Sequence, residues 1–402
     1  MKVSEVLNKI ENLELTFDDI YNNDFELDVD KSLIEELITK YNNKQMAFKI
    51  LMNSLFGALD NKYFFIHNRN MSGSITFIGR FMIQFTSKKV NEYLQNVFKS
   101  NKNYIIYSDT DSFYFSLEDF VKLIENKMGK KYEEMTDEEK EKLLNTLLKF
   151  IDKVNNVAEN AIKEIQEKLN VKEPGFMGFK VEKINEKGIW IAKKRYALKT
   201  IWNEGTILIN KPKLSVTGLE IVRSSTPDFV IDKLEKALLI MMDKDEKDLQ
   251  EFVQEVKKEF FEKCDNNPEV IAKTSSVNNL DYKKDKKGYY RLNENGVRIP
   301  CPINSRAAIL HNELVNKNGL WDIYPLITEG DKIKYVPLKL PNPINENVIG
   351  FIDEGFLFDV DLVKYIDKEQ AFQTNFLQPL KLIADAINYK FEKENKIDLD
   401  EW

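Results

Sequence analysis

The spacing of apolar residues predicts helices in the first hundred residues. From Asp30, which can cap a helix, apolar side chains recur every three or four positions, and the pattern resumes through KQMAFKILMNSLFGAL. The Asn42–Asn43 pair between the two runs is expected to break or bend the helix. A further helix fits residues 76–98. Residues 31–98 are therefore expected to be mainly helical.

Strand patterns follow in two stretches. Residues 104–116 contain IIYSDTDSFYF, where aromatic and β-branched runs flank a turn-forming Ser-Asp-Thr-Asp and predict a β-hairpin with two acids at its tip. Residues 176–222 hold four strand-like runs: FMGFKVEKI, GIWIAKKRYALKTIW, TILIN and KLSVTGLEIV. Residues 118–170 are helical and charged, with Thr136 at a helix start, and residues 226–402 mix helices with loops. The pattern indicates an α+β fold.

Composition limits the class of protein and the residue types that could carry catalysis. The 402 residues, 43% hydrophobic and 31% charged, are typical of a soluble globular protein of two or three domains. No apolar run reaches membrane-spanning length, so we expect no membrane partner and a cytoplasmic location, in the host cell if the gene is viral. With two cysteines and two histidines, catalysis is expected to rest on carboxylates, lysines and hydroxyls.

Charge is unevenly distributed. The net charge of -7 argues weakly against a nucleic-acid partner. Residues 176–223, however, carry ten Lys or Arg and four Glu, a local net of +6, and residues 391–402 carry a local net of -3. A basic middle and an acidic tail differ from an evenly solvated surface.

Three groups of residues are candidates for chemistry. In the first, Asp109 and Asp111 share a hairpin tip, where like charges repel unless a cation compensates them. Mg²⁺ prefers carboxylate oxygens, so the pair would make half of a magnesium site. Asp-x-Asp alone favours a solvated turn, but the flanking Tyr107 and Phe113–Phe115 argue for a packed sheet.

The second group is a helical stripe. Lys49, Asn53 and Phe56 follow Gln45 at spacings of four, four and three, which would suit a nucleoside triphosphate. The opposite face suits a core and comprises Ala47, Leu51, Leu55 and Ala58. Taken alone, the stripe favours an amphipathic surface helix.

The third group lies in GIWIAKKRYALKT. On a strand, Lys194 and Tyr196 would share one face, and Lys193 and Arg195 the other. Basic residues interleaved with aromatics favour phosphate-backbone contact. A solvated basic strand is an equal alternative.

Together, and in this order, the three groups resemble the motifs of family B DNA polymerases. KILMNSLFG from Lys49 resembles motif B, YSDTDS from Tyr107 resembles motif C, and KKRY from Lys193 resembles the motif of that name. The likeness is greatest to replicative polymerases of T-even-type bacteriophages, which share PKLSVTGLE from Pro212 and SSTP from Ser224. It runs from about residue 31 to the C-terminus.

The resemblance implies a right-hand polymerase architecture. Residues 1–61 would be the C-terminal part of the fingers, residues 62–208 a palm with an antiparallel sheet and helices, and residues 209–402 the thumb with an acidic tail. The implied activity is addition of dNTPs to a primer 3′ end on a DNA template by two Mg²⁺ ions.

The resemblance also assigns roles to single residues. Asp111 would be the main metal ligand, with Asp109 beside it and Glu182 in an accessory role. The residues implied for dNTP binding are Lys49, Asn53 and Phe56. Those implied for DNA binding are Lys193, Lys194, Arg195 and Tyr196, with Lys213 a weaker candidate.

The sequence departs from the family pattern in several places. Ser108 replaces the glycine of motif C, and Phe56 replaces a tyrosine. Only 48 residues precede Lys49, and none resembles motif A, whose aspartate shares the metals, or the exonuclease motif. We therefore expect a split polymerase, active with a second chain that supplies the N-terminal half, and the alternative is a truncated product or a partial gene model.

Two alternatives and one further partner complete the expectations. A non-catalytic DNA-binding or scaffold relic would have had no reason to keep Asp109, Asp111, Lys49 and Asn53. A generic Mg²⁺-dependent phosphohydrolase would need further clustered acids or histidines. The tail KIDLDEW is a candidate sliding-clamp peptide, with a frayed acidic terminus as an equal alternative.

Overall fold

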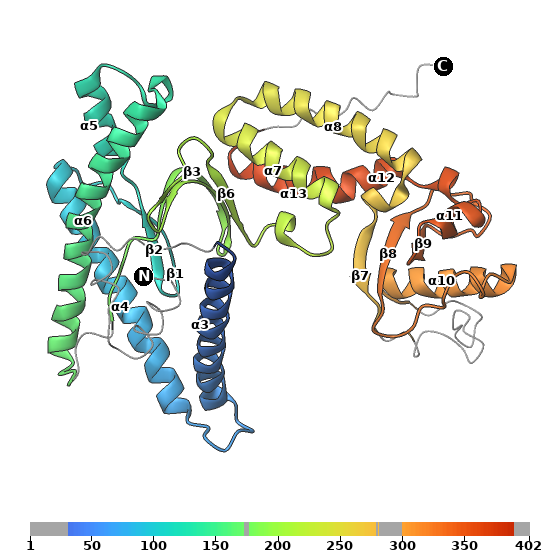
Figure 1. Cartoon of the computed structure of the whole chain (residues 1–402), viewed down its shortest axis with the longest axis horizontal. Helices are drawn as coiled ribbons and strands as arrows, with labels where there is room; N and C mark the ends of the chain where they lie inside the picture. The colour runs from blue at the N-terminus through green and yellow to red at the C-terminus, as the bar shows by residue number, and fades with distance from the viewer. Residues whose placement is uncertain (1–30, 173–176, 279, 281–299, 390–402) are drawn as a thin grey trace. The chain divides into compact units, whose positions relative to one another are not determined.

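The chain folds into two compact units. The computed structural model describes residues 31–172, 177–278, 280 and 300–389. The first unit combines Met1–Ser116 with Val157–Met177, and the second combines Leu117–Asn156 with Gly178–Trp402. Figure 1 gives the elements of both, which are described separately below.

Two long helices form most of the first unit. Helix α3 (Lys31–Asp60) and helix α4 (Arg69–Phe98) are joined by a short loop (Figure 1). The Ser72 hydroxyl donates to Asp60 at 3.0 Å and ties the two helices together. Of the predicted break or bend at Asn42–Asn43, the break is wrong, because α3 continues through both residues. Two asparagines cost a helix only about 1 kcal/mol, and no proline interrupts the run.

Helix α4 supports the predicted hairpin. Strands β1 (Ile105–Asp109) and β2 (Ser112–Phe115) pair antiparallel, as the sequence predicted. Tyr104, directly before β1, is fully buried, and its backbone N–H donates to Asn91 of α4 at 2.8 Å. The predicted helix at 76–98 begins earlier, at Arg69, because the Asn68 side chain caps it by accepting from the Met71 N–H.

The second unit contains an antiparallel sheet. Strand β4 pairs with β3, β5 and β6. The strands are β3 (Lys183–Ala192), β4 (Arg195–Asn203), β5 (Thr206–Ile207) and β6 (Lys213–Thr217). The described part of the FMGFKVEKI run is not a strand before Lys183, and TILIN contributes only the two residues of β5.

Helices cover this sheet. The predicted helix start at Thr136 is confirmed: its N–H donates to Glu139 at 2.8 Å, and its hydroxyl accepts from the Glu139 N–H at 3.3 Å. Within the second unit, Leu144 packs with Ile201 and Ile209 in one buried cluster. The elements here are α5 (Glu118–Met128), η1 (Tyr132–Glu134) and α6 (Asp137–Lys168), whose C-terminal end belongs to the first unit.

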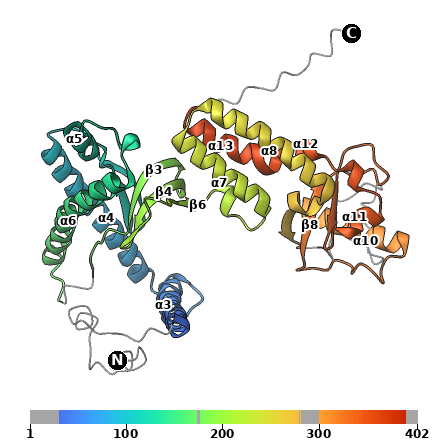
Figure 2. The same ribbon diagram turned by 45° about the horizontal axis from the view of Figure 1, so that its top comes forward.

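Residues beyond β6 build the main core. Figure 2 shows α7, α8 and α13 side by side, and the sheet β7-β8-β9 packs against α10. Its largest fully buried side chains include Phe260, Phe351, Phe356, Phe372 and Phe376. The helices are η2 (Glu220–Val222), α7 (Asp228–Asp243), α8 (Glu246–Asn266), η3 (Pro268–Ile271), α10 (Ile303–Asn318), α11 (Gly355–Asp359), η4 (Val363–Tyr365), α12 (Lys368–Phe372), the π-helix η5 (Gln373–Leu377) and α13 (Gln378–Ala386). The strands are β7 (Lys273–Ser276), β8 (Lys332–Pro337) and β9 (Val348–Phe351).

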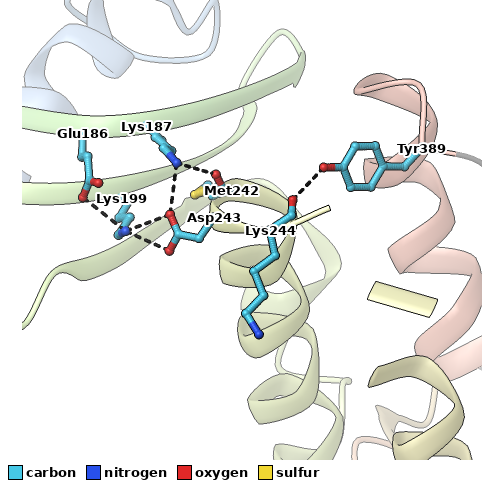
Figure 3. Close-up of polar contacts among 7 residues, drawn as sticks. All are labelled: Glu186, Lys187, Lys199, Met242, Asp243, Lys244 and Tyr389. Carbon is cyan, nitrogen blue, oxygen red and sulfur yellow. Dashed lines mark hydrogen bonds and ion pairs between the residues drawn. The ribbon is translucent and has the colours of Figure 1, made fainter. Parts of the chain in front are cut away.

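Ion pairs join the first sheet of this unit to the end of α7. Lys199 on β4 donates to both Asp243 oxygens at 2.9 and 2.8 Å and pairs with Glu186 at 3.2 Å (Figure 3). Lys187 on β3 donates to Asp243 at 3.3 Å and to the Met242 carbonyl at 2.9 Å. Because these groups lie at the C-terminal end of α7, the lysines also satisfy its negative end.

The structure confirms a mixed α+β fold with small antiparallel sheets. The right-hand assignment and the boundaries at residues 61 and 208 stay predictions. Among the described residues, no helix is both long and apolar enough to cross a membrane. The tail KIDLDEW, on which clamp binding was predicted, lies outside the described residues.

Candidate functional site

The two acids lie at the end of a tight hairpin in the first unit. Asp109 pairs with Ser112, which leaves Thr110 and Asp111 as the connection. Thr110 has a φ of 55°, and the Asp111 N–H donates to the Asp109 carbonyl at 2.7 Å, which closes a γ-turn on Thr110. The Thr110 hydroxyl donates to the Asp109 carboxylate at 3.0 Å, while Asp111 is exposed. The turn thus holds one carboxylate in place and presents the other to solvent.

The hairpin rests on aromatic side chains. The rings of Tyr107 and Tyr114 face each other across the strands at 6.3 Å, and those of Phe113 and Phe115 lie 6.2 Å apart. Cross-strand aromatic pairs stabilise a hairpin and fix its register. The position of the two acids therefore follows from the flanking residues, as the sequence indicated.

Helix α3 presents the predicted stripe. Lys49, Asn53 and Phe56 are all exposed on one continuous helix, in the same unit as the hairpin. The expectation that the opposite face is buried is wrong for the described residues, since Leu51 is 63% and Leu55 50% exposed. Phe56, at 36%, is among the less exposed of the large apolar side chains on this helix.

The KKRY segment forms a turn in the second unit. Ala192 at the end of β3 pairs with Arg195 at the start of β4, so Lys193 and Lys194 connect the strands. Lys194 has a φ of 61°. The predicted alternation of all four residues along one strand is therefore wrong. A continuous strand pattern contains no signal for a turn when the turn has neither glycine nor asparagine.

Strand β6 and the residue after it support this turn. Tyr196 on β4 pairs with Thr217 on β6. Gly218 has a φ of 65°, and a Cβ at this position would lie 2.0 Å from the Lys194 carbonyl oxygen. Only a residue without a side chain permits this contact. The PKLSVTGLE run therefore positions the KKRY turn.

Glu220 holds two arginines. Its Oε2 accepts from Arg195 Nη2 at 3.0 Å, and its Oε1 pairs with Arg223 Nη2 at 3.1 Å. The Glu220 side chain is 19% exposed, and that of Arg223 61%. Arg195 is thus engaged within the chain, and its contact with DNA stays a prediction.

The candidate residues divide between the two units. The first unit holds Asp109 and Asp111 with the α3 stripe, and the second holds Glu182 and the KKRY turn. Lys213 pairs with Thr200, four residues along β6 from Thr217, so about 13 Å of strand separates it from the turn. Across the described ranges, no three His, Cys, Asp or Glu side chains gather as a metal site.

Three supporting residues were not predicted from the sequence. Thr110, Gly218 and Glu220 all lie in runs that the motif comparison had picked out, but none was given a role. A glycine directly after the alternating stretch Lys213–Thr217 was the available signal for Gly218. No sequence signal shows that Glu220 would meet Arg195, because the two lie 25 residues apart.

Comparison with known proteins finds one matching family model and several similar proteins. A model of DNA polymerase family B matches residues 27–146, a range that contains the α3 stripe and the hairpin. This stretch is a family B DNA polymerase region. Most of the chain is distantly homologous to phage polymerases: it is 29% identical over 387 residues to the DNA-directed DNA polymerase of Enterobacteria phage T4 and 28% identical over 367 residues to that of Escherichia phage RB69.

The shared segment is a limited part of these relatives. The two alignments cover 91% and 87% of this chain but 40% and 38% of the phage proteins. DNA polymerase 1 of Aeropyrum pernix is 22% identical over 370 residues, which cover 89% of this chain and 29% of that protein. The chain therefore spans about 40% or less of the length of these relatives.

Proposed function

We propose that this chain supplies the C-terminal portion of a replicative DNA polymerase, which adds dNTPs to a primer 3′ end on a DNA template. The observation that carries the proposal is the tip of the hairpin. There, a γ-turn holds Asp109 and exposes Asp111, within the family B region.

The donor set at the tip fits magnesium. Asp109 and Asp111 offer carboxylate oxygens, the ligands that Mg²⁺ prefers, and two carboxylates leave room for the waters and substrate phosphates that it keeps. Two Mg²⁺ ions bound there would lower the pKa of the primer 3′-hydroxyl and neutralise charge on the leaving pyrophosphate. Asp111 would be the direct ligand, while Asp109, already engaged by Thr110, would hold the tip in shape.

The α3 stripe would bind the incoming nucleotide. Lys49 and Asn53 are one helical turn apart and exposed, so an ammonium and an amide can approach the same triphosphate. Phe56 would pack against the base pair being formed. Because phenylalanine has no hydroxyl, this contact would rest on the ring alone.

The KKRY turn would bind the primer strand. Lys193, Lys194 and Tyr196 gather at one end of the β3–β4 pair, which suits contacts to successive phosphates. Arg195 would act through Glu220 to fix the turn. Glu182 precedes β3 and is exposed, so an accessory role in metal binding remains part of the proposal.

The metal site would be completed by an aspartate from outside these 402 residues. In the described part of the chain, β1 and β2 pair only with each other, and a two-stranded hairpin is marginally stable alone. Both outer edges could therefore accept another strand. We propose that this strand comes from the motif A portion of the polymerase, on a second chain that also carries any exonuclease.

Primer extension tests the proposal. The 402-residue chain is assayed alone, and then with the polymerase portion that carries motif A, on a primer–template with Mg²⁺ and dNTPs. We expect extension only in the second case. Robust extension by the chain alone would refute the need for a second portion.

Two variants test the site itself. In the assembled enzyme, Asp111→Asn should abolish extension and leave DNA binding largely intact, because the amide removes a metal ligand without adding bulk. Glu92→Gln, an equal loss of charge at an exposed position on α4, is the matched control and should retain activity. Near-normal turnover by Asp111→Asn would remove this residue from the metal site. DNA binding without extension by the assembled wild type would favour the non-catalytic alternative.

A further inference from the structure

Two lysines lie directly opposite each other in the sheet of the second unit. Lys187 on β3 pairs with Lys199 on β4, so both side chains project from one face. Like charges at directly opposite positions destabilise a sheet unless an anion compensates them. Burial lowers the pKa of Lys199, but the hydrogen bond to Asp243 and the charge of Glu186 outweigh it and raise this pKa above its usual value. The ammonium is therefore charged and needs a counter-ion.

A β-bulge brings one carboxylate to the lysine pair. The register shifts between Asn185 and Lys187, which leaves Glu186 as the extra residue on β3. The Glu186 carboxylate lies 3.2 Å from the Lys199 ammonium, and the two side chains are 15% and 13% exposed. Glu186 balances one of the two lysines, so the second anion must come from outside the sheet.

Asp243, at the C-terminal end of α7, is this second anion. Its carboxylate accepts from Lys199 at 2.9 and 2.8 Å and from Lys187 at 3.3 Å, so it contacts both opposed lysines (Figure 3). The neighbouring Lys244 ammonium points away from this cluster and lies 3.8 Å from Asp248 (Figure 3). The opposed lysines are therefore fully compensated only when the end of α7 is docked on the sheet.

The backbone at the end of α7 is held as well. The last carbonyls of a helix have no partner within it. The Lys187 ammonium donates to the Met242 carbonyl at 2.9 Å, and the Tyr389 hydroxyl, in the segment after α13, donates to the Lys244 carbonyl at 2.9 Å (Figure 3). Strands β3 and β4 and the segment after α13 thus hold the same helix end.

Apolar packing also joins α7 to the sheet. Ile189 of β3 and Ala197 of β4 are buried in one core with Leu234 and Leu238 of α7. Hydrophobic contact is non-directional, whereas hydrogen bonds require donors and acceptors to be aligned. The core therefore holds the two elements together, and the charged cluster selects one orientation of the helix on the sheet.

We propose that Asp243 is a positioning residue, which docks α7 on β3 and β4 in one orientation and thereby places the KKRY turn relative to the helices beyond β6. The inference rests on the proposed function, in which the turn binds the primer strand and the predicted thumb beyond residue 208 contacts the same duplex. Tyr196 and Lys199 lie on one strand, so a rotation of α7 on the sheet changes the distance between the two groups of DNA contacts.

Charge reversal at Asp243 tests this placement through DNA affinity. Binding of a fluorescein-labelled primer–template duplex to the full chain is followed by anisotropy, at a temperature where circular dichroism shows each variant to be folded. Asp243→Lys should bind the duplex about tenfold more weakly than Asp232→Lys. Asp232 is the matched control, because it lies on the same helix, is 55% exposed and pairs with Lys236 one turn along it. Both variants change the net charge equally.

A charge swap tests whether Asp243 acts through its contact with the sheet. Lys187→Asp combined with Asp243→Lys exchanges the two charges and places a carboxylate opposite Lys199. This double variant should restore most of the affinity that Asp243→Lys loses, because rescue depends on the ion pair and not on the stability of α7 alone. Should Asp243→Lys fail to fold, Asp243→Asn is compared with Asp232→Asn and should again be the weaker binder.

The outcomes separate this inference from the proposed function. If the wild type does not bind the duplex, the proposed function fails. If the wild type binds and Asp243→Lys binds as tightly as Asp232→Lys, only the positioning role fails, and the ion pairs serve stability alone. A loss that the charge swap leaves unchanged would also overturn the inference, because the effect would then belong to α7 and not to its contact with β3.

Discussion

Replacing Gly218 by alanine should disturb the KKRY turn through one atom. The added Cβ would lie 2.0 Å from the Lys194 carbonyl oxygen and 3.3 Å from Arg195 Cγ. Real Cβ contacts essentially never fall under 3.0 Å, so the two segments must separate by about 1 Å. The obstructing group is backbone, which cannot rotate away as a flexible side chain would. The β3–β4 turn itself must therefore move.

Two energetic costs set how far Gly218→Ala lowers the free energy of unfolding: one for the backbone conformation and one for the lack of space. A left-handed φ costs alanine about 1–2 kcal/mol, and the lower entropy of its unfolded chain returns about 0.4–1 kcal/mol. Forcing a methyl group into a filled space costs about 1–3 kcal/mol more. Gly129→Ala measures the backbone term alone, because Gly129 has a φ of 67° against 65° for Gly218 and open space around it. The difference between the two variants therefore gives the steric term.

Urea unfolding of both variants measures the difference. Trp190 and Trp202 lie on β3 and β4 and report on the sheet by fluorescence. We expect Gly218→Ala to lose about 1–3 kcal/mol more free energy of unfolding than Gly129→Ala, and to bind primer–template more weakly. Losses that agree within about 0.5 kcal/mol, with equal DNA binding, would refute the positioning of the turn by Gly218.

Two further predictions concern groups outside the site. Burial raises the pKa of Asp243, but hydrogen bonds from Lys199 and Lys187 outweigh it and hold this pKa below the ordinary 3.8. The resulting stability is complete above the unfolded pKa and is lost as pH falls through the lower folded pKa. Because the Asp243 side chain is 37% exposed, solvent screens these ion pairs, and Asp243→Asn should reduce the free energy of unfolding by about 1 kcal/mol at neutral pH. The difference between wild type and variant should disappear as the pH falls through the folded pKa of Asp243. A gap that is independent of pH would contradict the ion pairs. Burial raises the pKa of the Cys264 thiol to about 11, so a thiol reagent at neutral pH should label the less buried Cys301 and reach Cys264 only in the unfolded chain. Equal labelling of both in the native protein would show that Cys264 is accessible.

The elements that were predicted correctly depend on residues that lie close to them in the sequence. The helix start at Thr136 needs only Glu139 three positions later, and the hairpin needs only the aromatic runs beside its turn. The connection at Lys193–Lys194 depends instead on Gly218, which is distant in sequence. The local alternation of residues therefore predicted a strand at Lys193–Lys194, where the structure has a turn. The pairing of Glu220 with Arg195 was missed for the same reason.

The apolar face of α3 shows a second limit of prediction from sequence. The apolar positions of α3 recur at helical spacing, and that spacing predicted the helix itself. The pattern says which face can be buried but does not say which molecule covers it. Leu51 and Leu55, at 63% and 50% exposure, lie on the face that the sequence assigned to a core. Such exposed apolar surface is typical of an interface, which agrees with a polymerase portion outside these residues.

The conformation of Thr110 bears on the choice that the sequence left open between a solvated turn and a metal-binding tip. A β-branched residue in the left-handed region costs about 1–3 kcal/mol, and glycine or asparagine would avoid that cost in a turn that only reverses the chain. Threonine, however, brings a hydroxyl that donates to Asp109. The strain is thus coupled to the orientation of a carboxylate, and such coupling is typical of functional sites. The turn geometry therefore favours the metal-binding interpretation, independently of the sequence motif.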